Sequence, residues 1–117
     1  MDQETYRTTK EQLAEWIGIG LKKDGVIEDH EYPLSRPDHQ TEYRCCALGL
    51  ALTGKFGSPE KAYLALHERV ESPQDYISAF AFLLDISRER SETIDHEHCE
   101  RRIPARSIAD RLRKRSL

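Results

Sequence analysis

The stretch TEYRCCALGLALTGKFG, residues 41–57, is the most apolar part of this 117-residue chain. Read as a helix, it has apolar residues on two faces: Tyr43, Cys46, Ala47 and Leu50 on one, and Leu48 and Leu52 near another. A helix that is apolar most of the way round belongs in the centre of a fold. We therefore predict that residues 43–53 form the central helix, and that the glycines at 54 and 57 end it.

The segments around this stretch carry several helix signals. A capping box, Thr8-Thr9-Lys10-Glu11, precedes apolar residues spaced four apart, and two Ser-Pro pairs have the order usual at an N-cap and first helical position. The expected helices cover residues 9–22, the segments after Ser58 and Ser72, residues 85–101, and the segment from Pro104 onward. The predicted fold class is therefore all-α: a compact single domain over residues 1–117, with five or six short helices and residues 1–7 frayed.

Residues 24–41, DGVIEDHEYPLSRPDHQT, form the one long irregular segment, because Pro33 and Pro37 break any helix there. Two short apolar runs within it could pair as one small β-hairpin or lie over the core. Loops of this length in compact domains are often functional. Its potential metal ligands are Asp29, His30, Glu31, Asp38 and His39. These residues lack a structural-zinc spacing, so we interpret the segment as a solvated polar loop and leave a ligand or metal site there open.

Charge is distributed unevenly along the chain. Residues 101–117 hold seven bases and one acid, a net charge of +6, whereas residues 1–100 carry −9. A basic tail on an acidic body either docks on that body or on a second copy, or it contacts a polyanion. Docking on the body or on a second copy is the favoured interpretation. The tail residues predicted to bind a polyanion or an acidic partner are Arg102, Arg106, Arg111, Arg113, Lys114 and Arg115.

Cysteine usage and hydropathy indicate the compartment. Three cysteines, two of them adjacent, make a poor disulfide framework, which favours a reducing environment. The chain has no run of about 18 apolar residues, and its first residues include an acid and no apolar region. We therefore expect a cytoplasmic protein with no membrane contact and no secretory signal.

Cys45 and Cys46 are too close in sequence to act together on a metal. Adjacent residues on a helix point about 100° apart and cannot share a tetrahedral site. Buried free cysteines behave as small apolar side chains. Core packing is therefore the favoured role for both.

The cluster His96-Glu97-His98-Cys99 contains the candidate metal ligands His96, His98 and Cys99. On a helix, His96 and Cys99 share one side, His98 faces away, and Cys99 is also an i,i+4 neighbour of Asp95. A closed zinc site needs four ligands, and an open one needs three plus water. The missing ligands would have to come from Cys45, Cys46, His67 or the 24–41 loop. A polar helix face is favoured, and we expect no cofactor.

The segment IDHEHCERRIPARSIADRLRK, residues 94–114, resembles the opening of a helix-turn-helix unit of the resolvase or homeodomain-like kind. Residues 105–112, ARSIADRL, follow the Ser/Ala-x-x-Ile-Ala-x-x-Leu pattern of these families. In the families a turn of about 3–4 residues and a recognition helix come next, but only residues 113–117 follow here. The resemblance is therefore to a truncated unit. Without a recognition helix, the nucleic-acid contact that this resemblance still allows is non-specific binding of phosphates by Arg111, Arg113, Lys114 and Arg115.

Residues 44–51, RCCALGLA, resemble the Cys-Ala-x-Gly-Ala-Leu core motif of an uncharacterised family of small bacterial helical proteins. The similarity covers about residues 9–70, and Leu50 stands where the family has alanine. It implies a bacterial or phage source. It also implies structural roles for Cys46 and Gly49, the latter as a close-packing position. The family brings no function with it.

No nucleophile elbow, phosphate-binding loop or metalloprotease motif occurs in the sequence, so an enzyme is not indicated. The uneven charge favours a non-enzymatic protein-interaction module: a small cytosolic regulator, adaptor or phage-type inhibitor that binds a protein partner through charged surfaces. The first alternative is a nucleic-acid-binding protein that uses the basic C-terminal helix, residues 101–117. The second is a metal-dependent enzyme that uses the His96–Cys99 cluster with the 24–41 loop. A homodimer is compatible with all three.

Overall fold

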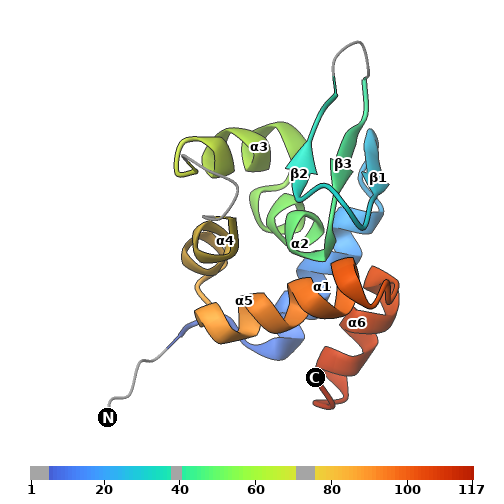
Figure 1. Ribbon diagram of the computed structural model, residues 1–117, viewed down its shortest axis with the longest axis vertical. Helices are drawn as coiled ribbons and strands as arrows, with labels where there is room; N and C mark the ends of the chain where they lie inside the picture. Colours follow the sequence, from blue (N-terminus) through green and yellow to red (C-terminus); the bar gives the residue numbers. More distant parts are fainter. Residues whose placement is uncertain (1–5, 38–40, 71–75) are drawn as a thin grey trace.

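The computed structural model describes residues 6–37, 41–70 and 76–117, and in these residues six α-helices pack together with a small sheet at one side (Figure 1). The helices are α1 (Lys10–Leu21), α2 (Ala47–Phe56), α3 (Pro59–His67), α4 (Tyr76–Leu84), α5 (Arg88–Asp95) and α6 (Ala105–Arg113), and a π-helical segment, η2 (His96–Glu100), continues α5. The predicted helical class and the count of five or six short helices are confirmed. No helix in these ranges is both long and apolar enough to cross a membrane.

The sheet has three strands in the order β1-β3-β2. They are β1 (Val26–Glu28), β2 (Leu34–Ser35) and β3 (Tyr43–Cys45). β1 runs parallel to β3 and β2 runs antiparallel to it. Two strands, β1 and β2, thus come from the 24–41 segment. We expected that they could pair with each other as a small hairpin, but each of them pairs with β3 instead.

The prediction that the central helix begins at residue 43 is wrong. Residues 43–45 form β3, with Tyr43 and Cys45 buried and Arg44 partly exposed between them. This alternation has the period of a strand, and the two strands of the preceding segment need β3 to satisfy their backbone groups. The helix begins only after Cys46, whose backbone N–H donates to the Pro33 carbonyl at 3.1 Å.

α2 is nevertheless the central element, as predicted. Its first seven residues are buried, and Figure 1 shows it near the middle of the molecule. α1 crosses α2 at very short range. A Cβ added at Gly20 of α1 would lie 2.1 Å from the carbonyl oxygen of Leu50, and a Cβ added at Gly54 of α2 would lie 2.1 Å from the carbonyl oxygen of Trp16. Only glycine allows two backbones to approach this closely. α2 ends at Gly57, which has a φ of 89°.

Helices α1, α3 and α6 begin within one residue of their predicted starts, whereas α5 begins at Arg88 and not at residue 85, because Asp85 has a left-handed φ of 57°. Side-chain oxygens of Thr9, Ser58 and Ser87 accept hydrogen bonds from the backbone of the first turns of α1, α3 and α5. The predicted start at Ser72 lies outside the described residues. The buried stripe of α6, which packs against α1, consists of Ala105, Ile108, Ala109 and Leu112.

Candidate functional site

The segment η2 places one histidine in the core and the other in solvent. A backbone bond from Arg101 N–H to the His96 carbonyl spans five residues and defines the π-helical turn. Such turns are rare and are frequent at functional sites. His98 is fully buried, whereas His96 is exposed. We predicted that this cluster forms a polar helix face, and the prediction is wrong for His98. The extra residue in the π-helical turn points this side chain into the core.

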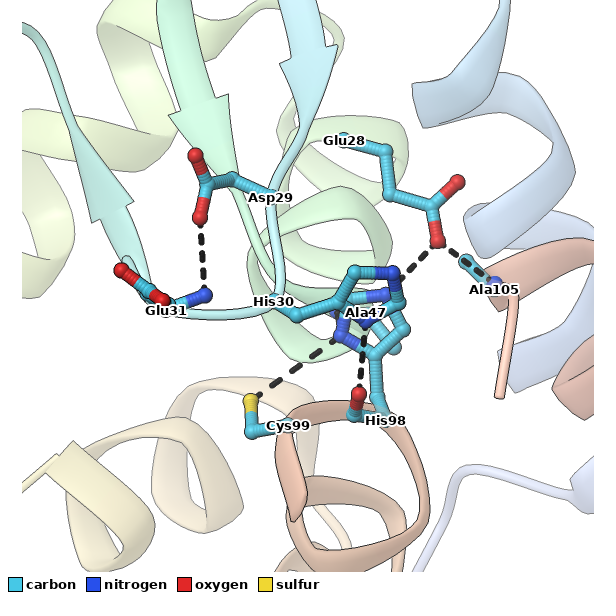
Figure 2. A network of polar contacts seen from close by, with 8 residues as sticks. All are labelled: Glu28, Asp29, His30, Glu31, Ala47, His98, Cys99 and Ala105. Carbon is cyan, nitrogen blue, oxygen red and sulfur yellow. Dashed lines mark hydrogen bonds and ion pairs between the residues drawn. The ribbon is translucent and has the colours of Figure 1, made fainter. Parts of the chain in front are cut away.

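Hydrogen bonds fix both the position and the tautomer of His98 (Figure 2). Its Nδ1 accepts from the Ala47 backbone N–H at 3.2 Å, so Nε2 carries the proton and donates to Oε2 of Glu28 at 2.7 Å. Ala47 is the first residue of α2, and its N-cap, Cys46, makes no side-chain capping bond. The imidazole of His98 therefore caps the central helix from a distant part of the chain.

Glu28 and His30 complete this network from the 24–41 segment. The same Glu28 oxygen accepts from the Ala105 backbone N–H at 2.7 Å, at the start of α6. His30 Nδ1 donates to the His98 carbonyl at 2.7 Å, and the two rings lie 4.2 Å apart between centroids. Figure 2 shows the stacked rings, with Glu28 on one side and Cys99 on the other. The network thus joins β1, α2, η2 and α6.

Glu28, His30 and His98 have the donor atoms for a metal, all within 4.8 Å of one another. However, both ring nitrogens of His98 and one Glu28 oxygen are already committed to hydrogen bonds. A metal bound to Nε2 of His98 would displace the proton from that nitrogen. If the proton moved to Nδ1 of the same ring, it would face the Ala47 N–H, and the hydrogen bond between them would be lost. Among the described residues no buried side-chain nitrogen or oxygen lacks a partner. We therefore assign this cluster a structural role.

A second cluster lies beside the first. The donor atoms of Cys46, Asp95 and Cys99 are also within 4.8 Å of one another. The contact with the Cys46 thiol, together with burial, raises the pKa of Cys99 far above its ordinary value. A neutral thiol is a poor nucleophile, so this cluster does not have the character of a cysteine-dependent active site. Cys45 is also buried, as predicted, and burial raises its pKa to about 12.

The sequence identified some of these residues and missed others. His30, His98, Cys99 and Cys46 were among the candidate ligands, but no pattern pointed to Glu28. Its partners lie 70 and 77 positions along the chain, beyond the reach of any local spacing rule. The candidates Asp38 and His39 lie outside the described residues.

The basic tail docks on the body of the same chain. Ion pairs join Arg102 to Glu31 at 3.3 Å, Arg111 to Glu97 at 2.7 Å, and Arg115 to Glu11 at 2.9 Å, while Arg113 pairs with Asp110 at 3.2 Å. The Arg111 guanidinium, with Arg101, holds the pKa of Glu97 below its usual range. Of the six predicted binding residues, Arg106 and Lys114 are exposed and form no ion pair within the described ranges. Binding of a polyanion or acidic partner by these six residues stays a prediction.

No protein-family model, curated protein or solved structure matches this chain. The resemblances to a bacterial helical family and to a truncated helix-turn-helix unit stay predictions. Gly49 belongs to the motif of residues 44–51 that resembles the bacterial helical family. A Cβ added at Gly49 would lie 2.1 Å from the Pro33 carbonyl oxygen. Gly49 thus lets the 24–41 segment lie directly on α2.

A different surface is formed by α4 and the end of α3. Phe82 is 63% exposed and Leu64 is 62% exposed, the largest values among the exposed large apolar residues of the described chain. The Arg69 guanidinium lies over the Phe82 ring, 3.7 Å from its centroid. A groove of about 540 Å³ lies beside the ring, and Lys55 and Arg88 are among the residues that line it. We call Phe82, Arg69 and this groove the Phe82 surface.

Proposed function

We propose that this protein is a non-enzymatic protein-binding module whose partner docks on the Phe82 surface. The observation that carries the proposal is the exposure of an aromatic ring on an apolar helix. Every residue of α4 except Ser78 is apolar, but only four of its nine residues are buried. Exposed apolar groups that continue into a groove mark interaction sites more often than isolated ones do.

The pairing of Arg69 with Phe82 supports a protein partner. Aromatic residues and arginine are enriched in the cores of protein interfaces, where they carry much of the binding energy. A guanidinium over an aromatic ring is also attracted to its face. That contact holds the Phe82 ring in place before a partner arrives, which lowers the entropy lost on binding.

The charges around the ring indicate the chemistry of the partner. Lys55 and Arg88 line the groove together with a single acid, Asp85. Lys55 is held there by donating to the Leu83 carbonyl at 2.5 Å. We expect the partner to insert an apolar side chain beside Phe82 and to place carboxylates near these cations. A small cytosolic regulator, adaptor or phage-type inhibitor would act in this way.

The test compares the partners captured by immobilised wild-type protein and by two variants. Phe82→Ala removes the exposed ring, and Arg69→Glu reverses the adjacent charge. Tyr32→Ala is the matched control, because Tyr32 is an exposed aromatic residue, at 45%, in the 24–41 segment. We expect a host protein that wild type and Tyr32→Ala retain and the other two variants lose. Equal capture by all four proteins would contradict the proposal, and sedimentation of purified protein would show whether the partner is a second copy.

One observation favours nucleic-acid binding as a second candidate function. A groove of about 470 Å³ between α1 and α6 is lined in part by Lys22, Arg106 and Arg113. Phosphate contacts by these residues would make affinity fall steeply with salt. DNA and RNA affinities measured against salt for wild type and for a variant with Lys22→Ala and Arg106→Ala would test it. An unchanged salt slope would rule out these two residues.

A further inference from the structure

We infer that Cys46, Asp95 and Cys99 form a binding site for a zinc ion. The inference is independent of the Phe82 surface and rests on three side chains from two parts of the fold. Cys46 is the N-cap of α2, Asp95 is the last residue of α5, and Cys99 lies in η2. Their donor atoms are within 4.8 Å of one another.

The donor set selects the metal. Two cysteine sulfurs and one carboxylate suit zinc, whereas magnesium and calcium prefer oxygen ligands alone. In a tetrahedral site with Zn–S bonds of about 2.3 Å, two sulfurs lie roughly 3.8 Å apart. A sulfur and a carboxylate oxygen on such an ion lie roughly 3.5 Å apart, so the present cluster needs to contract by about 1.3 Å at most.

The neighbouring histidine cluster shows why this set is the better site. There, a metal would have to replace hydrogen bonds that cap α2 and α6. In the cysteine cluster, a metal replaces the thiol protons, the weak contact between the two sulfurs and the weak contact of Cys99 Sγ with His98 Nδ1 at 3.9 Å, and Nδ1 keeps its bond from the Ala47 N–H. The carboxylate of Asp95, half-buried at the end of α5, forms no hydrogen bond or ion pair within the described residues. It is the one anionic group in this cluster, and no cation in residues 6–37, 41–70 or 76–117 forms an ion pair with it.

The position of Cys99 explains how an ion would enter. Cys99 and Asp95 line a depression of about 350 Å³, together with Glu31, Tyr76 and Ile77. Cys46 is almost fully buried beneath them. An ion entering from the depression meets the carboxylate and Cys99 first and then Cys46. With three protein ligands, the fourth coordination position would be left to water.

The binding reaction balances without an external oxidant or reductant. Two neutral thiols lose their protons, two Zn–S bonds and one Zn–O bond form, and two protons go to the solvent. The ion's charge of +2 is then balanced by two thiolates and one carboxylate, which leaves a net charge of −1. Binding would link η2 and the end of α5 to the start of α2.

The test uses the full chain, purified without a histidine tag, reduced and freed of metal with a chelator. Zn²⁺ is titrated in competition with a chromophoric chelator, and Co²⁺ is added to a second sample as a spectroscopic probe. We expect one zinc per chain, release of two protons per zinc, and a cobalt spectrum with thiolate charge-transfer and tetrahedral bands. Thermal unfolding should shift to higher temperature with zinc, because only the folded chain binds it.

Variants locate the site. Cys99→Ser is expected to lose the charge-transfer band from Cys99 and to weaken zinc binding by more than about a hundredfold, since even partners outside the coordination shell contribute about 10–100-fold. Asp95→Asn breaks no hydrogen bond of the folded chain and gives a second variant should Cys99→Ser fold poorly. Cys45→Ala and His96→Ala are the matched controls and should bind zinc as wild type does.

Three outcomes would overturn the inference. One is wild-type protein that binds no stoichiometric zinc. Another is a Cys99→Ser or Asp95→Asn variant, folded by circular dichroism, with wild-type zinc affinity. The third is loss of binding in Glu28→Gln but not in Cys99→Ser, which would move the site to the histidine cluster.

Discussion

Helices α2 and α4 are similar in composition and opposite in environment. α2, ALGLALTGKF, is buried along its first seven residues. α4, YISAFAFLL, is at least as apolar, yet it buries four residues and leaves Phe82 63% exposed. Apolar composition alone would have placed both helices in the centre of the fold.

Glycine accounts for the difference. α2 contains Gly49 and Gly54 and lies against Gly20 of α1, and at each of these positions a neighbouring backbone fills the space of a Cβ. α4 contains no glycine. Apolar residues thus indicate that a helix can be buried. Small residues such as glycine indicate on how many of its sides another backbone can pack closely. The uncovered side of α4 is where we expect a partner, and the following substitutions test this contrast.

The two phenylalanines of α4 should give the largest contrast in stability. Phe80 is 1% exposed, so Phe80→Ala is expected to lower the free energy of unfolding by about 3–5 kcal/mol. Phe82→Ala should lower it by less than about 1 kcal/mol, because the exposed ring contributes little to the core. Urea denaturation of both variants measures this. Equal losses would mean that the outer side of α4 is covered in the isolated protein.

Two glycines of α1 separate close approach from helix propensity. Gly20→Ala is expected to destabilise the fold by about 2–3 kcal/mol, since its Cβ would meet the α2 backbone. At Gly18 the nearest atom to an added Cβ is Arg113 Nη2 at 3.7 Å, an ordinary contact. Gly18→Ala should therefore stabilise the chain by about 0.5–1 kcal/mol. Opposite signs in thermal unfolding support the role of close packing, and two losses would argue against it.

The distant cap of α2 should have an intermediate effect. His98→Ala leaves the Ala47 N–H without its acceptor and Glu28 without one donor, and we expect a loss of about 1–3 kcal/mol. His96→Ala is the control, because His96 is exposed on the same turn and should change stability by less than about 0.5 kcal/mol. Hydrogen exchange should show faster opening at the start of α2 in His98→Ala. If both variants behave as wild type, the capping bond does not contribute.

The smallest effect concerns the ion pairs that hold η2 against α6. Arg111 and Arg101 lower the pKa of Glu97 in the folded chain, so this carboxylate stabilises the fold above the carboxyl pKa of the unfolded chain. That contribution is lost as the pH falls through the ordinary glutamate range toward the lower folded pKa. Glu97→Gln should therefore be less stable than wild type at neutral pH and should approach it in acid. A gap that stays constant from pH 7 to about 3 would contradict this.

Local patterns in the sequence predicted the parts of the fold that local forces determine. A threonine cap before α1, the serine cap Ser58 and the apolar stripe of α6 are read over three to seven positions, and the structure bears them out. Residues 43–45 were assigned wrongly because they directly precede the apolar run of α2, and Tyr43 fits the apolar face of a helix extended to include it. Their strand depends on pairing with β1 and β2, which no window centred on them contains.

The site was predictable only in part for the same reason. The i,i+4 spacing of Asp95 and Cys99 could be read directly, and Cys46 was one of several residues able to complete the set. What could not be read was the π-helical turn, which turns His98 inward. The hydrogen-bond partners of His98, which are Glu28 and Ala47, lie 70 and 51 positions away along the chain.

The bond between His98 and Ala47 also has a consequence for biosynthesis. The ribosome releases the chain from its N-terminus, so α2 emerges 51 residues before the side chain that caps it. Until then its first amide lacks the acceptor that it has in the folded chain, and the helix can pack only on elements made earlier, which are α1, the sheet, α3, α4 and α5. Pairings between distant residues are slow to form and leave apolar surface exposed meanwhile. The nascent chain therefore passes through an interval in which α2 is complete but lacks this cap, and that interval ends only when His98 has been made.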